Sequence, residues 1–383
     1  MTLVLVVDDS RFMRTIIGTA LEGAGFDVEM ASDGHEAVES AIELQPDVIT
    51  MDVEMPGLGG IEAVERIMAR QPAPILMLSA YTEPGAEATL DALERGAVDF
   101  LRKPDGSGDQ NVADMAEAVV ERVESLASAA VSEPALARAT AQSTAERRPT
   151  RESTIPAGSG TAVEPVKPTS TVPVEPDALL EDPTVVVGAS TGGPHVVEEL
   201  LESLPAELEA KGIVVQHMPA AFTGRFAERL DGRCALTVRE AADGDVVGPG
   251  EFVVAPGGHH LRVVENAGGR LRVEYDDSER VHGVRPAIDV TMESAATVVE
   301  DPIVGVVLSG MGRDGARGIE ALAGAGGTTI AQDESTSPVF GMPRQAINTG
   351  AVDRVLAAPE LPRGVVEAFT RSDVESSTGD GHG

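Results

Sequence analysis

The sequence predicts an α/β protein of two domains, each built on a mostly parallel β-sheet and joined by a flexible linker. Two observations lead to this prediction. Apolar runs alternate with stretches of helical spacing in both halves of the chain, and the segment between the halves has a different composition. A chain of 383 residues is long enough for two or three domains, each with its own core.

The first domain is predicted over residues 1–126. Apolar runs and helical stretches such as Phe12–Ala24 follow one another regularly, which is typical of a doubly wound parallel sheet with helices on both faces. The predicted strands are Leu3–Val7, Val48–Met51, Ile75–Leu78 and Ala97–Leu101.

Residues 127–180 are predicted to be the flexible linker. This segment has seven prolines and no aromatic residue, so it cannot bury enough apolar surface to offset its chain entropy. The second domain, an α/β domain with a mostly parallel sheet, is expected over 181–370, and a disordered tail over 371–383. The predicted strands of the second domain are Thr184–Val187, Ile213–Val215, Phe252–Ala255, Leu271–Val273 and Ile303–Leu308.

The chain carries a formal net charge of −34, and this acidity is spread evenly. Residues 1–126 hold 25 acids against 8 bases, and the remainder holds 38 against 21. Such a surface argues against nucleic-acid binding, which needs basic patches. We interpret the acidity as adaptation to high internal salt, where screening removes self-repulsion, and expect a halophilic source.

We expect a cytoplasmic protein without membrane insertion. No apolar run approaches the roughly 18 residues that span a bilayer. The N-terminus lacks the basic region and cleavage site of a signal peptide. The single Cys234 excludes an intramolecular disulfide.

Charged side chains follow several predicted strands of the first domain. Asp8 and Asp9 follow the first strand and Asp52 ends another, so the three carboxylates are expected to meet at one edge of the sheet. Such a cluster needs a cation, and Mg²⁺ suits all-oxygen ligands. Ser79 and Lys103 end two later strands and could reach the same crevice. Each residue alone could be a helix cap or a solvated charge, but five at consecutive strand ends favour a site.

This stretch resembles the receiver domain of two-component response regulators, which has a flavodoxin-like fold. The matching motifs are Asp8-Asp9, Met51-Asp-Val-Glu-Met-Pro-Gly57, Ser79-Ala80 and Phe100-Leu-Arg-Lys103-Pro104. The resemblance implies Asp52 as phosphoacceptor from a histidine kinase, with Asp8 and Asp9 helping to hold Mg²⁺. It implies that Ser79 and Lys103 contact the phosphoryl group and that Phe100 is the aromatic switch. Serine at 79 and phenylalanine at 100 are mild departures from the family pattern.

A second candidate site begins at Ser190, in a glycine-rich turn after the apolar run Thr184–Val187. Glycines on both sides of a serine at a strand end are typical of a nucleophile elbow, although a helix N-cap or a phosphate-binding turn fits as well. A serine nucleophile needs a base and an orienting acid. His217 ends a neighbouring strand and is the favoured base among seven histidines, and Asp314 lies in the loop after Ile303–Leu308. Asp314 alone could equally be a helix N-cap.

The chain order Ser190, His217, Asp314 differs from the order in α/β-hydrolases. Order and motifs resemble the catalytic domain of chemotaxis receptor protein-glutamate methylesterases. The matching segments are Gly188-Ala-Ser-Thr-Gly-Gly193, Val215-Gln-His-Met-Pro219, Phe222-Thr-Gly-Arg-Phe-Ala-Glu-Arg-Leu230, Ala255-Pro-Gly-Gly-His259, Ser309-Gly-Met-Gly-Arg-Asp-Gly315 and Phe340-Gly-Met-Pro343.

The resemblance implies a Ser190 nucleophile, a His217 base and an Asp314 orienting acid, and no cofactor for the hydrolase. Thr191 would support the site and the amide of Met311 would stabilise the oxyanion. The implied substrates are glutamyl methyl esters, and also glutamines, on the cytoplasmic helices of methylated chemoreceptors. The resemblance also implies that the receiver packs over the active site until the receiver is phosphorylated.

Two other functions are open to this sequence. A non-enzymatic regulator could bind a phosphorylated ligand at the Ser190 turn, which leaves His217 and Asp314 without roles. A receiver-linked α/β-hydrolase could act on small esters, but it needs its acid between Ser190 and His217, where no comparable strand-end loop occurs.

If the acidity is an adaptation to salt, the protein should lose its fold as salt is removed, because its carboxylates then repel one another unscreened. Circular dichroism across a salt series measures this loss. A protein that stays folded and active in salt-free buffer would contradict the interpretation.

Overall fold

The computed structural model describes residues 2–79, 83–103, 109–128, 172–175 and 178–371. Most of the predicted linker (127–180) and nearly all of the predicted tail (371–383) lie outside the described residues. Within the described part of the chain, no helix is long and apolar enough to cross a membrane.

The N-terminal domain is a five-stranded parallel sheet in the order β2-β1-β3-β4-β5, as predicted for a doubly wound domain. Its second strand was not predicted, because this edge strand has the acidic sequence DVEMA and is largely exposed. The strands are β1 (Leu3–Val7), β2 (Asp27–Ala31), β3 (Val48–Asp52), β4 (Ile75–Ser79) and β5 (Asp99–Arg102). The helices are α1 (Arg11–Gly23), α2 (Gly34–Leu44), α3 (Gly60–Arg70), α4 (Glu83–Glu94) and α5 (Asp109–Ser128).

The C-terminal domain is a seven-stranded parallel sheet in the order β15-β14-β13-β6-β7-β10-β8, with a smaller three-stranded antiparallel sheet beside it. The main sheet comprises β6 (Thr184–Ala189), β7 (Lys211–Gln216), β8 (Thr237–Glu240), β10 (Glu251–Val254), β13 (Ile303–Val307), β14 (Thr328–Gln332) and β15 (Arg354–Leu356). The small sheet comprises β9 (Val246–Val247), β11 (His260–Ala267) and β12 (Arg270–Asp276).

The buried strands β6, β7, β10 and β13 were predicted, whereas the buried strand β14 and the polar edge strands were not. Thr237–Glu240 and Arg354–Leu356 lie at the two edges and are only partly buried, so they lack continuous apolar runs. The predicted strand Leu271–Val273 lies instead in the antiparallel hairpin, where alternate residues are exposed.

Helices cover both faces of the C-terminal sheet. α7 (Gly193–Ser203), α8 (Ala220–Arg233) and α12 (Leu361–Ala368) lie on one face. α9 (Ile288–Val298), α10 (Ala316–Gly324) and α11 (Met342–Asn348) lie on the other. The first face shares one apolar cluster with the N-terminal domain, whereas the second face has its own.

The two domains are in direct contact. α4 packs against α7 and α8, and the ring of Phe100 in β5 lies 4.4 Å from that of Phe222 in α8. α5 continues two residues beyond the predicted domain boundary at 126. Leu179, near the end of the predicted linker, bridges to Thr370 and packs on the core of the second domain.

Candidate functional site

The carboxyl edge of the N-terminal sheet carries an acidic cluster. The Nζ atom of Lys103 lies 2.7 Å from Asp8 Oδ2 and 2.7 Å from Asp52 Oδ1, and both carboxylates are buried. One oxygen from each of Asp8, Asp9 and Asp52 lies within 4.8 Å of the others. Three carboxylates at this spacing form an all-oxygen ligand set that a hard divalent cation accepts.

Burial is the main influence on the pKa of Asp52. It raises the pKa of Asp52 to about 6, against the opposing effect of the Lys103 ammonium, while the charge of Asp8 raises it further. For Lys103, burial favours the neutral amine, but the Asp52 and Asp8 carboxylates outweigh burial and raise its pKa. A cation bound here would favour the ionised carboxylates in the same way as Lys103 does.

The remaining predicted receiver residues lie at the same edge. Ser79 is fully buried at the end of β4, and its carbonyl accepts a 2.7 Å bond from the Lys103 amide. Phe100 is buried against the second domain rather than exposed at the surface.

Ser190 lies in the turn between β6 and α7. Gly192 has φ +72°, in the left-handed region, and a Cβ added there would lie 2.6 Å from Pro338, so only glycine suits this turn. The carbonyl of Ser190 accepts a 2.8 Å bond from Gln216 Nε2, which ties the turn to the end of β7. The chain therefore fixes Ser190 at the edge of the sheet.

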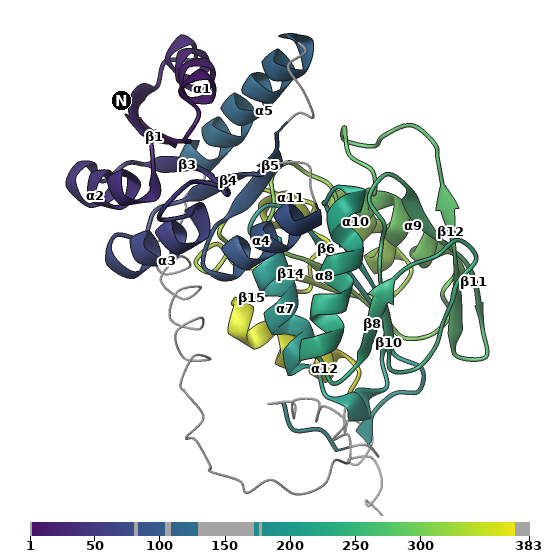
Figure 1. The fold of residues 1–383 in the computed structure, drawn as a ribbon. Helices are drawn as coiled ribbons and strands as arrows, with labels where there is room; N and C mark the ends of the chain where they lie inside the picture. Colours follow the sequence, from purple (N-terminus) through teal and green to yellow (C-terminus); the bar gives the residue numbers. More distant parts are fainter. Residues whose placement is uncertain (1, 80–82, 104–108, 129–171, 176–177, 372–383) are drawn as a thin grey trace, which may run out of the picture.

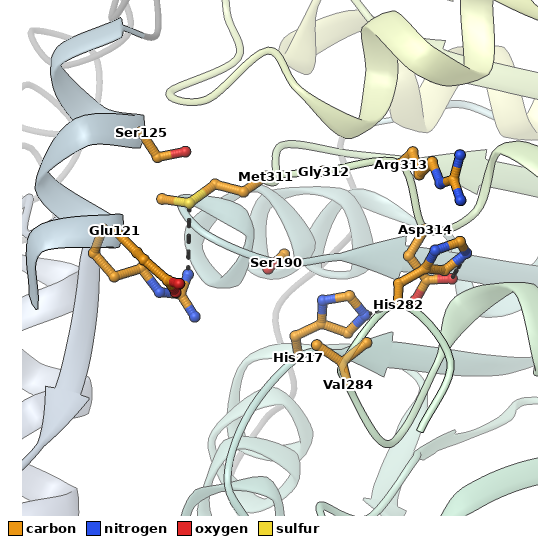
Figure 2. Close-up of a pocket in the computed structure, with 11 residues that line it drawn as sticks. Glu121, Ser125, Ser190, His217, His282, Val284, Met311, Gly312, Arg313 and Asp314 are labelled. Atoms are coloured by element: carbon orange, nitrogen blue, oxygen red, sulfur yellow. Dashed lines mark hydrogen bonds and ion pairs between the residues drawn. The ribbon is translucent and has the colours of Figure 1, made fainter. Parts of the chain in front are cut away.

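The structure brings Ser190, His217 and Asp314 together. They follow β6, β7 and β13, which are neighbours in the order β13-β6-β7, and all three line one cavity of about 330 Å³. His217 Nε2 lies 2.8 Å from Asp314 Oδ2 (Figure 2). Asp314 therefore engages the Nε2 atom of the imidazole and leaves Nδ1 without a contact to this carboxylate.

Asp314 is buried, and burial by itself raises its pKa. The hydrogen bond and charge of His217, together with the amides of Asp289 and Ile288, outweigh burial and hold the pKa below its ordinary value. Those two amides belong to the first turn of α9, at 2.9 and 2.7 Å. Asp314 thus caps a helix other than the one that follows it, and it binds His217 at the same time.

Asp289 mirrors this arrangement, and sequence reasoning missed it. Its carboxylate, fully buried in the first turn of α9, accepts bonds of 2.9 Å from the amides of Gly315 and Gly318 at the start of α10. Asp314 therefore caps α9, which carries Asp289, and Asp289 caps α10, which begins just after Asp314. The dipoles of both helices offset the two buried charges. This reciprocal capping fixes the position of Asp314.

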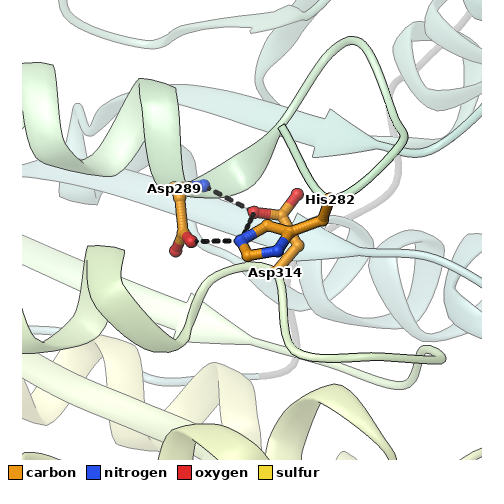
Figure 3. A group of neighbouring side chains, drawn as sticks. All are labelled: His282, Asp289 and Asp314. Atoms are coloured by element: carbon orange, nitrogen blue, oxygen red, sulfur yellow. Dashed lines mark hydrogen bonds and ion pairs between the residues drawn. The ribbon is translucent and has the colours of Figure 1, made fainter. Parts of the chain in front are cut away.

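His282 is a second histidine beside this pair that the sequence did not single out. Its Nε2 lies 2.7 Å from Asp289 Oδ2 and 3.9 Å from Asp314 Oδ1, and it lines the cavity (Figure 3). The only signal in the sequence was its place in a loop shortly before Asp289. The other histidines of the domain lie elsewhere: His195 pairs with Glu199, His259 with Asp277, and His260 is buried against a backbone carbonyl.

The N-terminal domain closes one side of the cavity. Glu121, Arg122 and Ser125 of α5 line it together with Met311 (Figure 2). Arg122 Nη1 donates to Thr191 Oγ1 at 2.7 Å and to Asp99 Oδ2 at 2.8 Å, and the Thr191 hydroxyl donates to Asp99 Oδ2 at 2.7 Å. The residue after Ser190 is thus bound by two residues of the other domain, which sequence reasoning did not identify.

The raised pKa of Asp52 leads to a stability prediction. Because folding favours protonated Asp52, its stabilising contribution is present below pH 3.8 and is lost as the pH rises through about 6. Without divalent cations, Asp52→Asn should therefore raise the free energy of unfolding near pH 7.5 by on the order of 2 kcal/mol, and by less near pH 4.5. Denaturant unfolding at both pH values measures this.

Asp33→Asn is the matched control. The pKa of Asp33 is lowered, mainly by the amide of Glu36, so its removal should destabilise the domain near neutral pH. An Asp52→Asn effect that does not change with pH would show that the buried charge is not its cause.

Comparison with known proteins finds relatives of both domains. A family model described as CheB methylesterase matches residues 185–365, and one described as response regulator receiver domain matches residues 4–111. The protein-glutamate methylesterase/protein-glutamine glutaminase of Halobacterium salinarum is 48% identical over 373 residues, covering 97% of this chain and 100% of the relative. That of Thermotoga maritima is 39% identical over 374 residues, covering 95% and 97%. Several similar proteins come from haloarchaea, in agreement with the acidic composition.

Two solved structures each match one domain. The Thermotoga maritima CheB methylesterase catalytic domain is 42% identical and covers 48% of this chain and 97% of its own, with a TM-score of 0.46. The response regulator domain of Thermotoga maritima CheB is 48% identical and covers 32% of this chain and 94% of its own, with a TM-score of 0.31. The full-length similarities show that this chain belongs to the CheB family of protein-glutamate methylesterases/protein-glutamine glutaminases, with an N-terminal receiver domain.

Proposed function

We propose that this chain hydrolyses glutamyl γ-methyl esters on the cytoplasmic helices of chemoreceptors, and deamidates glutamines there, under control of receiver phosphorylation. The observation that carries the proposal is the convergence of Ser190, His217 and Asp314 on one cavity from three adjacent strands, with a 2.8 Å bond between His217 and Asp314. The proposal places the enzyme in the cytoplasm, where these helices lie.

In the proposed reaction, Ser190 Oγ attacks the ester carbonyl while its proton passes to Nδ1 of His217. Asp314, fixed by reciprocal capping, orients the imidazole and stabilises the imidazolium. His217 then returns the proton to the departing methoxide, which leaves as methanol. Water hydrolyses the acyl-enzyme by the same route, and ammonia leaves instead of methanol when glutamine is the substrate.

Two further residues support this chemistry in the proposal. The amide of Met311, a residue that lines the cavity, donates to the oxyanion of the tetrahedral intermediate. Thr191 holds the turn: its carbonyl accepts a 2.8 Å bond from Ser309 Oγ, which links the strand ends of β6 and β13.

The receiver takes a phosphoryl group on Asp52 from a histidine kinase. Asp8, Asp9 and Asp52 would hold Mg²⁺, which neutralises charge on the transferring phosphoryl oxygens. Lys103, already bonded to Asp52, would pair with a phosphoryl oxygen, and the Ser79 hydroxyl would contact another.

The described structure supports an inhibited resting state. α5 lines the cavity, Arg122 and Asp99 hold Thr191, and the carbonyl of Val98 accepts a 2.8 Å bond from the Gly192 amide. Phe100 joins this contact to the phosphoacceptor edge, because it packs on Phe222 from β5, which only β4 separates from the strand of Asp52. Phosphorylation adds charge at that edge and would loosen the contact.

Release of methanol from methyl-labelled receptor membranes tests the proposed reaction. Wild type should release methanol, Ser190→Ala should release none, and Asp52→Asn should no longer respond to a phosphodonor. A folded wild-type protein that releases no methanol, with or without phosphodonor, would overturn the proposed function and favour ligand binding at the Ser190 turn.

The inhibited state leads to a separate prediction. Arg122→Ala should raise the hydrolysis of a small neutral ester by the unphosphorylated enzyme about tenfold, because charge-assisted hydrogen bonds between the domains are lost. Steady-state assays without phosphodonor measure this. Arg70→Ala, at the exposed end of α3, should leave the rate unchanged. An equal rate in wild type and Arg122→Ala would count against inhibition through this contact.

A further inference from the structure

Helix α8 carries a row of arginines that the catalytic chemistry does not use. Arg225, Arg229 and Arg233 are spaced four residues apart, which places them along one face of the helix over about 12 Å. α8 begins three residues after His217, so the row leads away from the active site. We call these three residues the arginine row.

Acidic side chains of α4 in the receiver pair with two members of the arginine row, Arg229 and Arg233. Glu94 lies 2.6 Å from Arg229 Nη2 and 2.7 Å from Arg233 Nη1, and Asp91 lies 3.6 Å from Arg229. α4 has the sequence EPGAEATLDALE, with four acidic residues and no basic one, and it lies beside α7 and α8 (Figure 1). The occupant of the row in this structure is thus an acidic helix.

Carboxylates of α7 hold the same arginines from the catalytic domain's own side. The buried Glu198 lies 2.7 Å from Arg229 Nε, and Glu202 lies 3.8 Å from Arg233 Nε. These partners belong to the catalytic domain itself, so their contacts with Arg229 and Arg233 do not depend on the receiver. Arg229 is therefore held by a carboxylate from each domain, Glu94 of the receiver and Glu198 of the catalytic domain.

The charge of the whole chain makes this surface distinctive. With a net charge of −34, most of the protein repels a helix that carries several glutamates. The catalytic domain accommodates an acidic helix at the arginine row, next to the active site: Phe222 in the first turn of α8 contacts Phe100, and the preceding Asp99 bonds Thr191 beside Ser190.

We propose that the arginine row is the docking site for the glutamate-rich helix of the substrate, and that α4 of the receiver occupies it as a substrate mimic in the closed state. The inference rests on the proposed function, because that function makes the substrate an acidic helix. It adds a recognition surface outside the cavity and a reason for inhibition beyond steric cover: receiver and substrate compete for the same arginines.

Binding of a fluorescent helical peptide with glutamates at every fourth position tests the proposal. The full chain is used, at the lowest salt at which wild type stays folded, and fluorescence anisotropy gives Kd. Glu94→Gln should tighten binding relative to wild type, because it weakens the mimic. Adding Arg225→Gln and Arg233→Gln to Glu94→Gln should weaken binding about tenfold relative to Glu94→Gln alone. Arg229 is left intact because its loss would strand the buried Glu198.

The controls separate docking from stability. Arg239→Gln, on β8 and paired with Asp245, should not change Kd in the Glu94→Gln background. A peptide with alanine at the glutamate positions should bind weakly to every variant. A lower Kd for Glu94→Gln and a higher Kd after the arginine substitutions support the proposal, because simple destabilisation of the protein would shift both Kd values in the same direction.

Equal Kd values with and without the arginine substitutions would overturn the docking site. If Glu94→Gln does not lower Kd, the proposal that α4 mimics the substrate is overturned. Neither result depends on ester hydrolysis, so failure of docking is distinguishable from failure of the proposed function, which methanol release reports.

Discussion

The structure depends on one constraint: both candidate sites stand at the carboxyl edge of a parallel sheet. Adjacent strands in such a sheet lie about 4.8 Å apart, so residues that follow neighbouring strands are brought together whatever their separation along the chain. β1 and β3 present Asp8 and Asp52 in this way, and β6, β7 and β13 present Ser190, His217 and Asp314. Both sites of the protein follow from this geometry.

Charges buried at these edges are each matched by donors. Lys103 bridges Asp8 and Asp52, and amides from two helix N-termini satisfy Asp289 and Asp314. Unmatched, such carboxylates would cost far more than the fold could supply. The matching also has a functional consequence, since the donors that stabilise Asp314 fix the direction from which it holds His217.

The interface between the domains joins the two sites. α5 of the receiver lines the cavity that Ser190 lines, and α4 covers arginines of α8. Phe100 lies between these contacts, on a strand that pairs with β4 and ends beside Lys103. A change at the phosphoacceptor edge thus acts on a surface that covers both the catalytic cavity and the proposed docking site.

The sequence alone indicated the fold class, most of the buried strands and the candidate residues that follow strand ends in both sites. Apolar runs and strand-end polar residues record burial and turn geometry directly, so Asp52, Lys103, Ser190, His217 and Asp314 could be named without coordinates. Edge strands such as β2 and β8 could not be predicted from the sequence, because exposure removes the apolar pattern on which the prediction of strands depends.

Only the tertiary structure decided which groups meet across the chain. The capping of α9 by Asp314 and of α10 by Asp289, the place of His282 beside them, and the hold of Arg122 and Asp99 on Thr191 join residues far apart in sequence or on different helices. No local pattern marks such partners, since a capping carboxylate or a paired arginine resembles a solvated charge until the packing of helices and domains brings its partner to it.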